Sequence, residues 1–240
     1  MVYNWLKSIQ SRIYPQDCLI CGAPGDFPTR FCHPCYLSLP FNHHACPACA
    51  LPLPPGTTPA SRCGSCQHKR LPFHSTTTAL LYEPPISRLI SGFKFHQQLY
   101  LTAPLARLLI HRLGKLTNPP ELILPVPLHP RRLQERGFNQ ALELGRILAK
   151  HYAIPLDWRL VNRNRHTRAQ SDLSEEARRR NLRHAFRVRG SVKGARVVIL
   201  DDVITTGSTI TELSKTLEKA GAKQIDVWAL ARTAPNHPGY

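Results

Sequence analysis

Apolar positions change their spacing close to Thr76, and this change divides the chain into two parts. Beyond that point, short apolar runs alternate with segments in which apolar residues recur every three or four positions. Short apolar runs are typical of buried strands, and the wider spacing is typical of amphipathic helices. The alternation therefore predicts an α/β domain in which helices flank a mostly parallel sheet.

The same pattern predicts the individual elements of this domain. The segment Arg196–Leu200 is almost wholly apolar, as expected of a central parallel strand that is covered on both faces. Gly221 follows the last predicted helix as a natural C-cap. The expected strands are 77–82, 122–126, 196–200 and 224–230, and the expected helices are 84–95, 101–113, 139–151 and 207–220.

The part before Thr76 has a different character. Its first residues have apolar positions at helical spacing, interrupted by polar ones, which predicts an amphipathic helix rather than a signal peptide. The remainder is rich in Pro, Cys, His and Gly and cannot bury enough apolar surface to fold alone. We therefore expect an N-terminal helix (1–15), a small module (16–74) and the α/β domain (75–240).

All eight cysteines fall in four C-x-x-C couples within the small module. A C-x-x-C turn directs two thiolates at one ion, and two couples complete a closed tetrahedral zinc site. Disulfides are disfavoured because no secretory signal is evident. Two structural zinc ions would supply about 10–16 kcal/mol each to the folding of such a module. The expected ligands are Cys18, Cys21, Cys32, Cys35, Cys46, Cys49, Cys63 and Cys66.

Spacing alone leaves open which couples share an ion. A sequential arrangement places the first two couples on one zinc ion and the last two on the other, as two zinc ribbons. An interleaved cross-brace is the alternative. Four thiolates fill each site in either arrangement, so we expect the remaining candidate ligands to lie on the surface; they are His33, His43 and His44.

The most specific stretch of the chain is Val197–Thr209, with the sequence VVILDDVITTGST. A buried strand is expected to end in Asp201 and Asp202, at the sheet edge where ligands bind in open α/β folds. These carboxylates suit two vicinal ribose hydroxyls, and the following turn, Thr205–Thr209, suits a phosphate at a helix N-terminus. An ordinary capped helix is the alternative, but one cap needs one hydroxyl, and two buried acids are costly without partners.

This stretch resembles the phosphoribosyl pyrophosphate (PRPP) motif of type I phosphoribosyltransferases at all thirteen positions. With the four cysteine couples and several further segments, the whole chain resembles the ComF family. That resemblance implies a double zinc ribbon followed by a Rossmann-like, type I phosphoribosyltransferase-like domain, and a role in DNA uptake during natural transformation. The further segments are Leu89–Phe95, Pro125–Leu128, Arg136–Gln140, Arg165–Gln170 and Arg180–Phe186.

The resemblance also implies roles for single residues, with Mg²⁺ bound alongside PRPP. The two acids would contact the ribose, the turn after them would hold the 5′-phosphate, and arginines after Val126 would face the pyrophosphate. The segment Arg163–Leu173 would be a mobile loop over the ligand, contacting it through Arg168 or Arg165. Lys94 is a further phosphate candidate. The expected PRPP contacts are Asp201, Asp202, Thr205, Thr206, Gly207, Ser208, Thr209, Arg131, Arg132, Arg136 and Arg168.

The positive net charge of the chain indicates which classes of molecule it attracts. The chain carries a net charge of +17, and residues 130–189 hold fifteen Lys and Arg against six Asp and Glu. Such a domain attracts polyanions. Together with this charge, the resemblance to the ComF family implies a PRPP-binding accessory protein that contacts single-stranded DNA or a competence ATPase. Its zinc-module aromatics are either stacking surfaces or packing around the metal; they are Phe27, Phe31, Tyr36 and Phe41.

An active phosphoribosyltransferase with an unknown acceptor is the other interpretation. The sequence reveals no acceptor pocket. Thr205 stands where enzymes acting on 6-oxopurines place an acid, and the cysteines are all assigned to zinc, which leaves none as an amidotransferase nucleophile. Because no run of 18 apolar residues occurs, we expect no membrane span and a cytoplasmic location.

Overall fold

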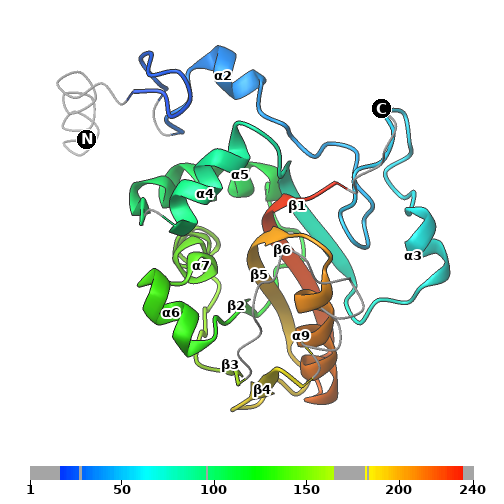
Figure 1. The fold of residues 1–240 in the computed structure, drawn as a ribbon. Helices are drawn as coiled ribbons and strands as arrows, with labels where there is room; N and C mark the ends of the chain where they lie inside the picture. Colours follow the sequence, from blue (N-terminus) through cyan, green and yellow to red (C-terminus); the bar gives the residue numbers. More distant parts are fainter. Residues whose placement is uncertain (1–16, 27–28, 96, 165–181, 183, 235–240) are drawn as a thin grey trace, which may run out of the picture.

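The computed structural model describes residues 17–26, 29–95, 97–164, 182 and 184–234 (Figure 1). The expected helix at 1–15 and the expected contacts Arg165 and Arg168 lie outside these residues, as does Phe27.

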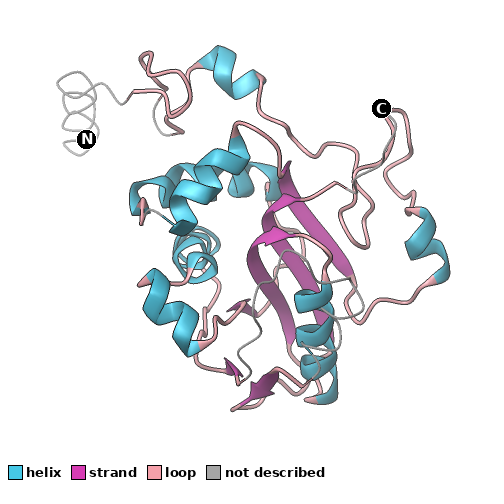
Figure 2. Cartoon of the chain, in the orientation of Figure 1, coloured by secondary structure: helices cyan, strands magenta, loops and turns pink. Residues whose placement is uncertain are grey.

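A four-stranded sheet forms the centre of the molecule, with the strand order β1–β6–β5–β2 (Figure 2). All three strand pairs are parallel, as the apolar runs predicted. β5 and β6 occupy the middle and pair from Arg196 and Gln224 to Ile204 and Arg232. The strands are β1 (Ser75–Leu81), β2 (Leu122–Pro125), β5 (Arg196–Ile204) and β6 (Gln224–Arg232).

Helices cover both faces of this sheet, so the pleat of β5 builds two cores. Val198 and Leu200 enter the core beneath α4 (Ile86–Phe95), α5 (Thr102–Leu113) and α7 (Gln140–Tyr152). On the opposite face, Val197 and Ile199 pack in a second core with α9 (Ser208–Lys219) and with the short strands β3 (Val161–Arg163) and β4 (Phe186–Val188). The predicted layered α/β architecture is confirmed.

Three features differ from the sequence prediction. β5 continues to Ile204 rather than ending at Leu200, because it keeps pairing with β6 after β2 has ended. Arg163, expected in a mobile loop, lies in β3, which pairs antiparallel with β4. The segment after β2 contains a helix, α6 (Pro130–Arg136), which begins with a proline and is followed by Gly137 in a left-handed conformation.

The small module lies beside strand β1 and is hydrogen-bonded to it. It contains the short helices α2 (His33–Leu37) and α3 (Gly64–His68), each starting directly after a cysteine. The hydroxyl of Thr76 on β1 donates to the Ala48 carbonyl at 2.8 Å, and the Asn42 amide donates to the hydroxyl of Thr78 on β1 at 2.8 Å. The module therefore shares hydrogen bonds with the sheet.

In the part of the chain that the structure describes, none of the helices combines the length and the apolar character that a membrane crossing requires.

We expect Leu144→Ala to lower the free energy of unfolding by about 2–5 kcal/mol, because Leu144 is fully buried on α7 and its truncation leaves a cavity. Leu142→Ala, the same change at a half-buried position of the same helix, should lower it less. Urea unfolding followed by circular dichroism measures both. Equal losses for the two variants would contradict this description of the core.

Candidate functional site

The site begins where β5 loses one of its two neighbours. β2 ends at Pro125, opposite Leu200, and Val126 makes the last backbone bond to Leu200 at 2.8 Å. β5 continues for four residues, Asp201 to Ile204, paired with β6 alone among the strands. Asp201 and Asp202 therefore lie inside the strand, not at its end as predicted, but beside an edge that β2 no longer covers. In open α/β sheets this carboxyl end of the strands is where ligands bind.

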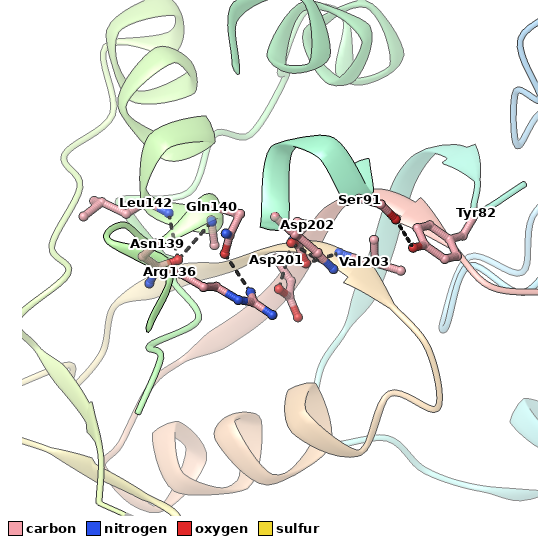
Figure 3. Close-up of polar contacts among 11 residues, drawn as sticks. Tyr82, Ser91, Arg136, Asn139, Gln140, Leu142, Asp201, Asp202 and Val203 are labelled. Carbon is pink, nitrogen blue, oxygen red and sulfur yellow. Dashed lines mark hydrogen bonds and ion pairs between the residues drawn. The ribbon is translucent and has the colours of Figure 1, made fainter. Parts of the chain in front are cut away.

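The two acids are neighbours on β5, and their side chains interact with each other. Asp202 is 7% exposed, and its Oδ2 lies 3.0 Å from Nζ of Lys94 on α4. Each carboxylate also accepts the next backbone N–H, that of Asp202 at 2.9 Å and that of Val203 at 2.7 Å (Figure 3).

Positive side chains from separate elements surround these acids. Burial raises the pKa of the Asp201 carboxyl, the charge of Asp202 raises it further, and Lys94 opposes both. Burial and, less strongly, the charge of Arg132 lower the pKa of Arg163 to about 10, and Asp201 opposes the shift. Lys94 of α4 and Arg163 of β3 therefore lie near the carboxylate pair, and Arg132 of α6 lies near Arg163.

A cavity of about 380 Å³ adjoins the acids through Lys94. It brings together two of the three arginines expected near the pyrophosphate, Arg132 and Arg136, whereas Arg131 is exposed on α6 and does not line it. The lining residues are Lys94, Phe95, Gln97, Arg132, Glu135 and Arg136.

The turn between α6 and α7 aims Arg136 at this site. Its Nη1 donates to Oε1 of Gln140 at 2.9 Å, and Figure 3 shows the side chain reaching toward Asp201. Asn139 caps α7 by accepting two backbone N–H groups, while its amide donates to the Val126 carbonyl at 3.0 Å. This role of Asn139 was not predicted, although an asparagine before an apolar helix is a cap signal.

The turn that follows β5, residues 205–209, is the segment expected to bind a phosphate, and we call it the phosphate loop. Gly207 has a φ of +76°, a left-handed conformation that favours glycine, and it begins the 12-residue helix α9. The hydroxyls of Thr206 and Ser208 lie 2.9 Å apart. The first N–H groups of a helix have no intrahelical acceptor, so the start of α9 suits an anion. The acids and this loop thus belong to one strand–turn–helix unit.

The cysteines form two separate groups of four thiols. Cys18, Cys21, Cys32 and Cys35 have sulfurs within 4.8 Å of one another, and so do Cys46, Cys49, Cys63 and Cys66. The couples therefore pair sequentially, and the interleaved arrangement is wrong. The sulfurs of Cys21 and Cys32 lie 3.7 Å apart and those of Cys49 and Cys63 lie 3.6 Å apart. A tetrahedral zinc–thiolate site has an edge of about 3.8 Å, so both groups fit zinc.

Electrostatics within the first group also fit a cation. Burial acts to raise the pKa of Cys18, but backbone N–H groups outweigh it and lower the pKa to about 6. The Cys32 thiol and burial raise the pKa of Cys35 to about 12. One ionised thiol therefore opposes ionisation of another, which a divalent ion at the centre would reverse. The three candidate histidines are all exposed, as expected.

Fold, phosphate loop and thiol groups define a class of protein. Residues 141–237 match the model of the phosphoribosyl transferase domain, and residues 9–67 match that of the double zinc ribbon domain. The chain is a protein of phosphoribosyltransferase fold that carries an N-terminal double zinc ribbon.

Known relatives then give the family. DNA utilization protein YhgH from Salmonella typhimurium is 37% identical over 225 residues, which cover 91% of this chain and 98% of that protein. Competence protein F from Haemophilus influenzae is 41% identical over 181 residues, 72% of this chain and 79% of that protein. The chain therefore belongs to the ComF family, which includes YhgH. A solved adenine phosphoribosyltransferase from Thermoanaerobacter pseudethanolicus is 16% identical over 57% of this chain and 83% of its own, with a TM-score of 0.36.

We expect the purified protein to hold two zinc ions per chain, because two complete thiol groups are present. Cys21→Ser and Cys63→Ser should each lower the zinc content by one ion, measured by mass spectrometry of the native protein. His33→Ser, beside a ligand but exposed, should leave two. Loss of both ions from a single-cysteine variant would contradict two independent sites.

Proposed function

We propose that this protein binds PRPP, or a closely related phosphoribosyl ligand, and supports the handling of single-stranded DNA. The observation that carries the first part is the joining of Asp201, Asp202 and the phosphate loop in one strand–turn–helix unit beside a basic cavity. The second part is supported by the names of its relatives, a DNA utilization protein and a competence protein.

The geometry suggests how each part of PRPP would be held. The 5′-phosphate fits the loop 205–209, and the ribose diol fits across the uncovered edge of β5. The pyrophosphate fits the cavity lined by Arg132 and Arg136, whose guanidinium groups suit phosphate oxygens. Lys94 forms an ion pair with Asp202 and also lines the same cavity. When the ribose hydroxyls bind the Asp202 carboxylate, the ammonium group of Lys94 can bind a phosphate instead. Bound Mg²⁺ would neutralise the pyrophosphate charge.

Exposed aromatic rings with arginines beside them support contact with single-stranded DNA. Phe95 is 66% exposed with the Arg136 guanidinium 5.2 Å from its centre, and Tyr100 is 55% exposed with Arg30 at 5.6 Å. Bases stack on such rings, and arginines attract the phosphates. We call these four residues the aromatic–arginine surface. We prefer it to the zinc-module aromatics as the candidate stacking surface, because Phe31 is fully buried and Tyr36 and Phe41 pack against the domain core.

Two further proposals follow the same reasoning. Zinc–thiolate sites persist in reducing compartments, so we infer that the protein works in the cytoplasm. A competence ATPase remains the proposed protein partner, on the basis of the family's role alone.

Asp202→Asn should weaken PRPP binding by about 10–100-fold, because a charged acceptor contributes about 1.5–3 kcal/mol to its hydrogen bonds. Titration calorimetry with Mg²⁺ measures this. Asp226→Asn is the matched control, since Asp226 lies near the opposite end of the sheet and accepts from Ser75 and Gln224. An unchanged affinity of Asp202→Asn would count against the proposed site.

The same protein, given PRPP, Mg²⁺ and a panel of bases and amines, should release no pyrophosphate if it is an accessory binding protein. Release with any acceptor would make it an active phosphoribosyltransferase instead.

Replacing Phe95 and Tyr100 together by alanine should weaken binding of a single-stranded oligonucleotide about tenfold or more, since stacking contributes about 1–3 kcal/mol per base. The slope of affinity against salt should stay unchanged, whereas Arg30→Ala should reduce that slope. Trp158→Ala is the control, because Trp158 is also exposed and contacts Arg159 elsewhere on the molecule. Fluorescence anisotropy over a salt series measures all three, and no binding at low salt would refute the DNA contact.

A further inference from the structure

Arg232, the last residue of β6, is a buried arginine at the centre of several chain segments. It is 6% exposed. Its Nε donates to the carbonyl of Cys49 at 3.2 Å, and its Nη1 donates to the carbonyls of Ile204 at 2.9 Å and Thr233 at 3.1 Å. The same nitrogen also donates to the carbonyl of Thr205. One side chain thus joins three segments that are distant in the sequence.

Two of these segments belong to different sites. Cys49 is a ligand of the second zinc site, and Ile204 and Thr205 form the entry to the phosphate loop. The guanidinium donates in a fixed planar fork, so a shift of the Cys49 backbone changes the direction of the donors that hold Thr205. A lysine keeps the charge but lacks the fork.

The second zinc site also compensates the buried charge of Arg232. Burying a cation is costly unless opposite charge lies nearby. Burial lowers the pKa of Arg232, and the thiol groups of Cys49, Cys63 and Cys66 oppose that shift. Four thiolates around Zn²⁺ carry a net negative charge, so a filled second site favours the position that Arg232 occupies.

The first zinc site contacts the domain elsewhere. Phe31 packs in the core of the domain. The guanidinium group of Arg30 lies over the ring of Tyr100, in the short helix η1 (Leu99–Leu101). The ring centres of Tyr36 and of His111 on α5 lie 6.2 Å apart. Among the described residues, no hydrogen bond recorded for residues 17–38 reaches the phosphate loop. The two zinc sites therefore differ in their connection to the ligand site.

We propose that Arg232 is a positioning residue that couples the second zinc site to the phosphate loop. Metal at Cys46–Cys66 holds the loop in its phosphate-binding shape, and metal at Cys18–Cys35 does not. Coupling between two sites is reciprocal, so a ligand on the loop must in turn retain the second zinc ion. This last consequence rests on the proposed phosphate site; the coupling between metal and loop shape does not.

The test compares full-length protein with Arg232→Lys. Removal of zinc by a chromophoric chelator is timed, with Cys21→Ser and Cys63→Ser assigning each phase to one site. In Arg232→Lys, zinc release from the second site should be at least fivefold faster, and release from the first site unchanged. Arg196→Lys is the matched control, because Arg196 lies at the opposite end of β5 from Ile204 and forms an ion pair with Glu121 at 3.5 Å. Unchanged release from the second site would overturn the proposal.

Hydrogen exchange of the peptide that spans the loop reads its shape without any ligand. Exchange there should accelerate in Arg232→Lys and in Cys63→Ser, but not in Cys21→Ser, while peptides of α5 stay unchanged. Should Arg232→Lys fail to fold, Cys63→Ser against Cys21→Ser still decides. Equal exchange in these two cysteine variants would refute the coupling.

Ribose 5-phosphate is the probe for the reciprocal effect. It should slow zinc release from the second site of the unaltered protein several-fold, and have no effect on the first site or on Arg232→Lys. Binding by calorimetry without slower release would refute the coupling. Failure to bind at all would instead count against the proposed function, and the release and exchange experiments would still decide on Arg232.

Discussion

β5 pairs with β6 for four residues beyond the point at which β2 ends. The rest of the candidate site depends on this extension of β5 beyond the end of β2. Hydrogen bonds to β6 hold the backbone of Asp201 and Asp202 rigid, while the missing neighbour leaves an edge that a ligand can approach. Because the same strand passes directly into the phosphate loop, the connection along the chain keeps the loop next to the acids.

Two carboxylates in this position need compensating charge, and the fold supplies it from elements that are far apart in the chain. Lys94 comes from α4, Arg132 from α6 and Arg163 from β3. The acids attract these cations, and the cations leave a basic cavity beside them. Lys94 belongs to both features, because it pairs with Asp202 and also lines the cavity.

The zinc module solves a different problem. It has too few apolar residues for a core of its own, and two groups of four thiols organise it instead. Its two halves are then attached in different ways, the first through buried and aromatic contacts such as Phe31, the second through hydrogen bonds to β1 and to Arg232. Among the residues that the structure describes, the second half is the one joined to the site by hydrogen bonds, through Arg232.

The sequence by itself determined whatever depends on neighbours along the chain. Apolar spacing predicted the four strands of the sheet and the helices that cover it, the C-x-x-C couples predicted the zinc ligands, and one segment predicted both the acids and the phosphate loop. The tertiary structure decided the sequential pairing of the couples, the helix α6 with Arg132 and Arg136 but not Arg131 at the cavity, and the contacts of Lys94 and Arg232. The spacing of residues along the chain shows which chemical groups a segment offers. Which groups contact one another is decided by packing, because packing brings together residues that lie far apart in the sequence.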